Sequence, residues 1–352
     1  MLVTQRPPTQ GPLTRDDLIV TLFGAGAFQI LNAGCELGLF SLLCNEPGLT
    51  AGEIAGKLAL RSRPTQVLLL GTTALRLTSL ADGRYRNAAL LDESLRDGSW
   101  EILRDMVAFE AHIVYQAQAD FVESLRQDTN VGLRRFPGQG TDLYHRLAGN
   151  PELEALFYRC MRSWSRLSNP VLTATADLTG VTRVVDVGGG DGVNAIALAT
   201  RNPGVDFTVL DLPGAAAIAR TTITEAGLAD RVTVCEADIF TDPYPPGHDC
   251  VLFANQLVIW SPEQNLQLLT KAYDTLPDGG RVLVFSAMSN TTGDGPLYSA
   301  LDNVYFTTLP AASSRIYQWD EYQGWLTSAG FSQVRFLPGD TWTPHGVISA
   351  TR

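Results

Sequence analysis

Hydrophobic residues recur at helical spacing through much of the first half of the chain. This pattern predicts helices over residues 19–43, 63–77, 100–124, 143–147 and 152–178. Thr50 and Glu53 have the spacing of a capping box, which predicts a short helix to Leu58. Residues 83–86 predict a small hairpin turn. Pro170 lies within the last helical stretch, where we expect it to kink or break the helix.

From Thr182 onward, short apolar runs typical of buried strands alternate with helical segments. The predicted strands are 183–187, 206–210, 232–236, 250–255, 281–286, 333–337 and 346–350, and the helices are 192–200, 214–226, 263–275 and 320–329. Regular alternation of this kind predicts an α/β fold with a mostly parallel, doubly wound, Rossmann-like sheet. The last two strands have no helix between them, so we expect one to be antiparallel.

These patterns divide the chain into three regions: a helical part (13–100), linking helices (101–180) and an α/β domain (181–352). The helix–turn–helix and hairpin of the first region resemble a winged helix, which in many proteins binds DNA. The segment that would be its recognition helix, residues 64–75, carries no charged side chain. We therefore expect a packing or dimerisation surface.

Composition narrows the possible partners. The 352 residues carry a formal net charge of −11, which argues against a nucleic-acid partner because phosphate binding uses clustered Lys and Arg. No run of about 18 apolar residues occurs, so we expect no membrane span. Five irregularly spaced cysteines without a CxxC pair favour a reduced, cytoplasmic protein, and with only four histidines we expect no metal site.

The most informative stretch is Val184–Gly192, in which a buried strand ends in Asp186 and turns through three consecutive glycines into a helix. Glycine permits a tight turn and a close approach of the backbone to a ligand, for which Gly188 and Gly190 are candidates. A dinucleotide site requires a third glycine three residues after the second. Val193 occupies that position, so the sequence excludes this reading.

Two further acids follow the next two strands. Ligands of doubly wound sheets bind at the carboxyl ends of the strands, where Asp186, Asp211 and Asp238 should gather. We expect Asp211 to accept both ribose hydroxyls of a nucleoside. Asp238 can accept the amino group of a base, with Ile239 packed on its ring. The alternative, that Asp211 and Asp238 cap helices, stays open.

An acid before the glycines, without the third glycine, resembles the first motif of the class I S-adenosylmethionine (SAM) methyltransferases. The whole chain is similar to the small-molecule O-methyltransferases, including the caffeate-type plant enzymes and the polyketide-tailoring enzymes of actinomycetes. The stretches that carry this resemblance are Leu37–Phe40, 49–58, 83–86, the glycine loop, Asp211–Pro213, Asp238–Phe240, Trp260, Gly279–Gly280 and Ala329–Phe331.

The resemblance implies SAM as cofactor and a homodimer in which the first domain closes the substrate pocket of the partner. It implies a small-molecule substrate, aromatic or derived from a polyketide or peptide. Together with the acids above, it places the cofactor contacts at Met161, Asp186, Gly188, Gly190, Asp211, Leu212, Asp238, Ile239 and Asn255.

The chain departs from this family where a histidine should act as base. That position is Val258, and the positions of two helper acids fall on Ile316 and Ser286. A general base supplies about 10²–10⁴-fold, whereas orientation corresponds to effective molarities of about 10⁵–10⁸ M. Methylation is therefore compatible with this sequence if the nucleophile is already activated, such as an enol, a phenolate-activated ring carbon, an amine or an acidic phenol.

Other polar and aromatic residues are candidates for the reaction site. His112, Asp302 and Asn303 are the candidate catalytic groups, although a lone helical histidine is more often structural. The candidate pocket residues are Tyr115, Trp164, Trp260, Tyr305, Phe306 and Trp319, each of which could instead belong to the core.

Three functions follow from these patterns. The first is a SAM-dependent methyltransferase of small-molecule biosynthesis that acts by proximity on a preactivated C, N or acidic O nucleophile. The second is a related enzyme that uses SAM as a cation that is not consumed, in a cyclisation, decarboxylation or hydroxylation. The third is a non-enzymatic winged-helix scaffold or DNA-binding protein.

Overall fold

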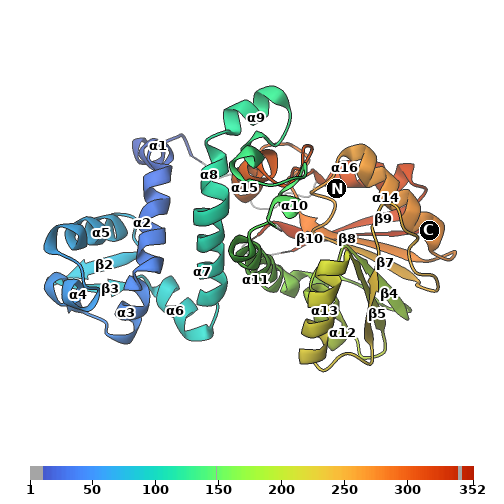
Figure 1. Cartoon of the computed structure of the whole chain (residues 1–352), viewed down its shortest axis with the longest axis horizontal. Coiled ribbons are helices and arrows are strands. Elements are labelled where there is room, and N and C mark those ends of the chain that lie inside the picture. Colours follow the sequence, from blue (N-terminus) through green and yellow to red (C-terminus); the bar gives the residue numbers. More distant parts are fainter. Residues whose placement is uncertain (1–10, 148, 340–342) are drawn as a thin grey trace. The chain divides into compact units, whose positions relative to one another are not determined.

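The computed structural model describes residues 11–147, 149–339 and 343–352. It separates into two compact units, each of which combines segments distant in the sequence (Figure 1). The N-terminal unit contains residues 11–116 and 152–164, and the sheet unit contains residues 117–151 and 165–352. The predicted linking region 101–180 is thus shared between the units, because its helices contribute residues to both.

The N-terminal unit has the predicted winged-helix-like arrangement of helices around a small antiparallel sheet of order β1-β3-β2. Its elements are α1 (Arg15–Leu22), α2 (Gly24–Glu36), α3 (Leu39–Asn45), β1 (Leu49–Thr50), α4 (Ala51–Lys57), α5 (Ser62–Ala74), β2 (Thr78–Ala81), β3 (Arg84–Asn87), α6 (Ala89–Asp97) and α7 (Trp100–Phe109). The capping box of Thr50 and Glu53 forms as predicted. Leu39, Leu43 and Ile54 are fully buried in the core of this unit.

The linking helices differ from the prediction in two ways. The segment after α7 forms a π-helical turn (Glu110–Val114), then α8 (Tyr115–Gln118) and α9 (Phe121–Gln127), so no single helix covers residues 100–124. A 3-10 turn (Val131–Arg135) and α10 (Leu143–Leu147) follow. In addition, α11 (Pro151–Thr175) continues through Pro170, so the expected break there is wrong. No single described helix has the length and hydropathy to cross a membrane; the bent pair α1 and α2 passes on length and composition alone.

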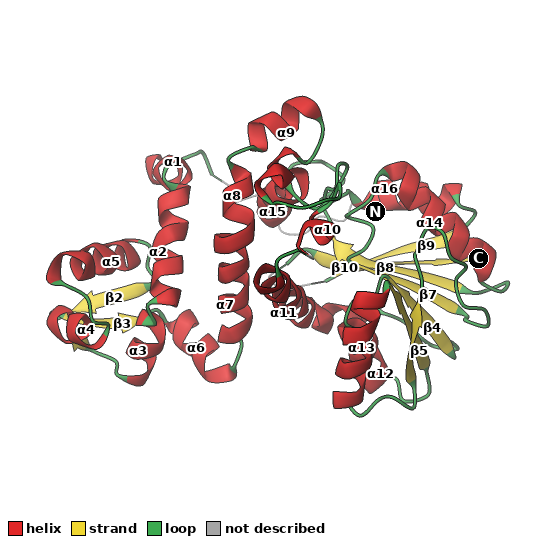
Figure 2. Cartoon of the chain, in the orientation of Figure 1, coloured by secondary structure: helices red, strands yellow, loops and turns green. Residues whose placement is uncertain are grey.

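The sheet unit is built on seven strands in the order β6-β5-β4-β7-β8-β10-β9 (Figure 2). They are β4 (Arg183–Val187), β5 (Asp206–Asp211), β6 (Val232–Glu236), β7 (Cys250–Ala254), β8 (Arg281–Ala287), β9 (Ser332–Pro338) and β10 (His345–Thr351). The pairings among β4 to β8 are parallel, whereas β10 is antiparallel to both of its neighbours. The mostly parallel, doubly wound sheet is therefore confirmed, and the expected antiparallel strand is β10, which lies between β8 and the edge strand β9.

Helices cover both faces of this sheet, which is why its strands read as continuous apolar runs. On one face, Val184 belongs to the core formed with α12 (Val193–Arg201) and α13 (Pro213–Glu225). On the other face, Val185 packs in the core formed with α14 (Pro262–Thr275) and α16 (Trp319–Ser328). A further helix, α15 (Leu297–Thr308), was not predicted. With both faces covered, the carboxyl ends of the strands are the place left for a ligand.

Candidate functional site: the cofactor edge of the sheet and helix α15

The glycine loop between β4 and α12 has a backbone that other residues rarely adopt. Gly188, Gly190 and Gly192 have φ angles of +69°, +58° and +80°, in the left-handed region that favours glycine. A Cβ on Gly188 would collide with the side-chain amide of Gln256, while Gly190 has open space where its Cβ would be. The loop therefore offers bare backbone to a ligand, as the sequence predicts.

Asp186 lies beneath this loop and is fully buried. Neither of its carboxylate oxygens has a hydrogen-bond partner among the described residues. Burial, and then the charges of Asp211 and Asp191, raise its pKa to about 7. A buried carboxylate without a donor is costly, so this group fits a site completed by a cationic or hydroxyl-bearing ligand.

Asp211 is the last residue of β5, which pairs with β4, and Asp238 follows β6, which pairs with β5. The three acids therefore share one edge of the sheet, as predicted. Asp211 accepts hydrogen bonds from the backbone N–H of Gly190 (2.8 Å) and of Leu212 (2.7 Å). Burial raises the pKa of Asp211. Asp238 accepts from the N–H of Phe240 at 2.7 Å, so both acids also stabilise their own turns. Leu212 is 48% exposed.

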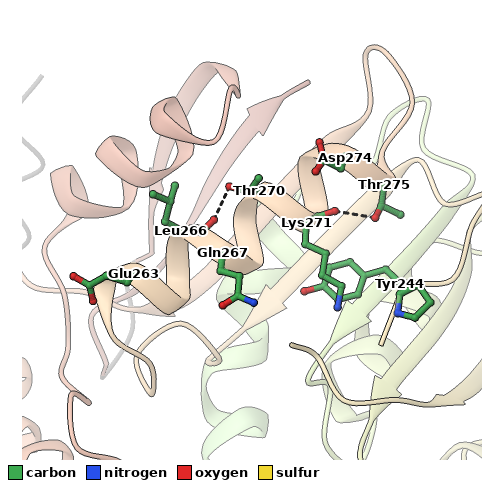
Figure 3. A pocket seen from close by; sticks show the side chains of 9 residues that line it. Tyr244, Glu263, Leu266, Gln267, Thr270, Lys271, Asp274 and Thr275 are labelled. Carbon is green, nitrogen blue, oxygen red and sulfur yellow. Dashed lines mark hydrogen bonds between the residues drawn. The ribbon is translucent and has the colours of Figure 1, made fainter. Parts of the chain in front are cut away.

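Lys271 of α14 holds the segment that carries Asp238. Figure 3 shows its side chain beside the ring of Tyr244. Its ammonium donates to the backbone carbonyls of Ile239 (2.8 Å) and Asp242, and lies 4.4 Å from the ring centroid of Tyr244. Burial lowers the pKa of Lys271, against the opposing effect of Asp238 and Asp242. No sequence pattern indicates this role, because a single lysine on an amphipathic helix is usually solvated.

A buried histidine orients Asn255 at the end of β7. His345 Nε2 lies 3.0 Å from Asn255 Oδ1, and His345 Nδ1 lies 2.7 Å from the hydroxyl of Thr343. Burial lowers the pKa of His345 to about 3, so its ring is neutral. With both nitrogens engaged, His345 positions Asn255 and is unsuited to act as a base. Asn255 has a φ of +55°, a strained conformation typical of functional loops.

The positions expected for the base and its helpers contain no proton acceptor. Val258 and Ile316 are 4% and 1% exposed, and Ser286 is 1% exposed. Trp260 follows in the same loop, packs edge-on against Phe240 at 4.9 Å and is half-buried. These surroundings join Trp260 to the segment that carries Asp238.

Helix α15 brings four of the candidate residues together. Asp302 has a pKa raised to about 7 by burial, which a hydrogen bond with Tyr298 partly offsets. Asn303 Oδ1 accepts the backbone N–H of Ile316 at 2.7 Å, so this side chain positions the segment before α16. Tyr305 and Phe306 contact each other, with ring centroids 5.0 Å apart. Asp302 is thus the titratable group in this cluster that is suited to move a proton at neutral pH.

The remaining candidates have other surroundings. Trp319 is 1% exposed and packs against Phe336, so it belongs to the core and not to a pocket wall. His112, Tyr115, Met161 and Trp164 belong to the N-terminal unit. There His112 Nε2 lies 3.5 Å from Glu36 Oε1 and Tyr115 stacks on Phe28. Within the described ranges, no group of three or more His, Cys, Asp or Glu side chains could hold a metal ion.

Residues 115–332 match the family described as the O-methyltransferase domain. The chain belongs to this methyltransferase family. It is 51% identical to an L-tyrosine C(3)-methyltransferase of Streptomyces lavendulae over 98% of this chain and 95% of that protein. It is 33% identical to a 3-hydroxy-5-methyl-1-naphthoate 3-O-methyltransferase of Streptomyces sahachiroi, covering 98% and 97%.

Solved structures agree with this assignment. The crystal structure of the SAM-dependent methyltransferase SibL has a TM-score of 0.86 and 58% identity, over 95% of this chain and 98% of that one. The fold is also that of human N-acetylserotonin methyltransferase in complex with SAM, with a TM-score of 0.83 at 23% identity. The chain is therefore a SAM-dependent methyltransferase, and the unpartnered Asp186 with its bare glycine loop fits that cofactor.

Proposed function

We propose that this methyltransferase transfers a methyl group to a ring carbon next to the hydroxyl of a phenolic amino acid, with L-tyrosine as the first candidate. The support is a relative of that activity, 51% identical along 98% of the chain. The observation that carries the proposal is the buried valine at position 258, where the O-methyltransferase pattern calls for a base. An ionised phenol can react at a ring carbon as well as at oxygen, and the activity of this relative favours carbon as the acceptor.

A phenolate spreads its charge onto the neighbouring ring carbons and is thus an activated carbon nucleophile. SAM, when bound, supplies an electrophilic methyl group. The Asp302 carboxylate, with a pKa near 7, can accept the phenolic proton at neutral pH. A carbon–carbon bond forms as the sulfur–methyl bond breaks, and the methylated ring carbon then loses its hydrogen as a proton to restore aromaticity.

L-tyrosine deuterated at ring positions 3 and 5 tests the proposal. With the purified protein and SAM, we expect a product that has gained one methyl group and lost one deuterium, with one S-adenosylhomocysteine released per product. O-methylation would retain both deuterium atoms and contradict the proposed position. Turnover without S-adenosylhomocysteine would instead favour the second function, in which SAM is not consumed. O-methyltyrosine, which cannot form a phenolate, is the control and should not react.

We further propose that the protein acts as a homodimer in the cytoplasm. Helix α1 and the residue after it expose large apolar side chains, with Ile19, Leu22 and Phe23 at 53%, 72% and 64% exposure. A patch of this kind is typical of a protein–protein interface. None of the five cysteines, all of which are described, forms a disulfide, which fits a reducing compartment.

A further inference from the structure

A hollow in the N-terminal unit lies outside the cofactor edge. It has a volume of about 440 Å³, within the range of ligand pockets, and all of its lining residues belong to this one unit. Its charged and titratable lining residues are Glu36 of α2, Arg104 and Asp105 of α7, His112 of the π-helical turn and Arg159 of α11. Single π-helical turns within helices are frequent at functional sites.

Polar side chains hold the two acids of this hollow. Asn32 Nδ2 donates to Glu36 Oε1 at 3.1 Å, and His112 Nε2 lies 3.5 Å from the same oxygen. The Ser163 hydroxyl donates to Asp105 Oδ2 at 2.8 Å. Each carboxylate is thus oriented while it retains acceptor capacity for a further donor.

The two guanidinium groups are separate from these acids. Among the described residues, neither Arg104 nor Arg159 forms an ion pair or hydrogen bond, although two carboxylates line the same hollow. The neutral lining residues add no competing charge, since burial raises the pKa of the Cys35 thiol to about 11. The hollow therefore carries guanidinium groups and carboxylates at different points of its wall, and among the described residues no ion pair joins Arg104 or Arg159 to Glu36 or Asp105.

We propose that this hollow binds the zwitterionic head group of an α-amino acid, with its carboxylate at Arg104 and Arg159 and its ammonium at Glu36 and Asp105. In the zwitterion, the carboxylate and the ammonium are attached to the same carbon. It can therefore pair with the arginines and the acids of the hollow at once, which a simple anion or cation cannot. Arginine is suited to this role because its planar guanidinium pairs with a carboxylate through two hydrogen bonds. The choice of a phenolic side chain rests on the proposed function, whereas recognition of the head group does not.

Calorimetric titration with three phenols tests this site: L-tyrosine, tyramine, which lacks the carboxylate, and 3-(4-hydroxyphenyl)propionate, which lacks the ammonium. We expect Arg104→Met and Arg159→Met each to weaken L-tyrosine binding by about 10–100-fold, the loss of a charge-assisted hydrogen bond. Tyramine binding should stay unchanged in both variants. Asp105→Asn should weaken tyramine and L-tyrosine but not the propionate. Arg63→Met, at an exposed arginine of α5, is the matched control.

The outcomes separate this proposal from the proposed function. Tyrosine that binds with this pattern but is not methylated would leave the head-group site in place and overturn the reaction. If L-tyrosine is methylated and binds the Arg104→Met and Arg159→Met variants as tightly as the unaltered protein, the head-group site alone is overturned. Absence of L-tyrosine binding to the unaltered protein would also overturn it.

Discussion

Asp302 and Asn303 are consecutive residues of α15 whose side chains have different partners. Asn303 is committed to the backbone of Ile316, so its amide serves the fold of the segment before α16. Burial raises the pKa of Asp302 to about 7, against an opposing effect of Tyr298. Of these two candidates, only Asp302 has the properties of a general base.

The first prediction concerns Asp302→Asn. We expect kcat for tyrosine methylation to fall by about 10²–10⁴-fold, the usual contribution of a general base. In the unaltered enzyme the rate should rise with pH through about 7, because the carboxylate form is the base, and this limb should vanish in the variant. Asp320→Asn, on α16, is the control. If the rate of Asp302→Asn still rises with pH through about 7, the base is another group.

The second prediction concerns Asp186→Asn. The pKa of Asp186 is about 7 in the fold against an ordinary 3.8, so its ionisation opposes folding by a few kcal/mol as pH rises from about 4 to above 7. Without cofactor at pH 8, the variant should have the higher Tm, with the gap closing toward pH 5. Its SAM affinity should fall at least tenfold. Equal Tm values of the variant and the unaltered protein at pH 8 would show that ionisation of the Asp186 carboxylate does not destabilise the fold.

At the scale of elements, α14 supports the cofactor edge through one side chain. Lys271 reaches from this helix to two carbonyls in the segment after β6, so the position of Asp238 depends on a helix 30 residues further along the chain. Lys271 touches neither a candidate cofactor side chain nor the reaction centre, and we regard it as a positioning residue.

The third prediction follows from this contact. Lys271→Met should raise KM for SAM about tenfold, because two charge-assisted hydrogen bonds are lost, while kcat changes by less than about twofold. Lys271→Arg should restore part of the affinity. Lys57→Met, on α4, is the control at an exposed lysine. A parallel drop in kcat and Tm would indicate general damage to the fold instead.

Elements formed by local patterns could be predicted closely. The strand β4 has the expected bounds, and the Thr50 capping box starts α4 where predicted, because both depend on neighbours in the sequence. Of the two outcomes expected at Pro170, the break is wrong, because α11 continues through this residue. The π-helical turn at residues 110–114 lies within the predicted helix 100–124, because the spacing of apolar residues does not distinguish an α-helical turn from a π-helical one. Helix α15 was missed.

At the scale of the whole molecule, the apolar face of α1 leads to the fourth prediction. Light scattering should give about twice the chain mass of 38.1 kDa for the unaltered protein and a single mass for a variant with Ile19→Asp and Phe23→Asp. Val122→Asp, an equally exposed apolar position of α9, should leave the mass unchanged. A monomeric unaltered protein would contradict the homodimer.

The candidate site was predictable where it follows from topology. Three acids after adjacent parallel strands must gather at one edge, and they do. The pairing of His345 with Asn255 joins residues 90 positions apart, and the charges of the N-terminal hollow come from three helices and a π-helical turn. No pattern in one stretch of sequence contains such contacts, so only the fold could reveal them.

The neutral ring of His345 also limits how the protein can be handled. Its pKa is about 3 in the fold and about 6.5 in the unfolded chain, so stability is complete above about 6.5 and falls as the solution is acidified toward 3. Acid precipitation or elution at low pH would favour the unfolded chain, in which the ring is free to take up a proton. The purified protein should therefore remain folded during storage in neutral buffers and unfold more readily in an acidified culture medium.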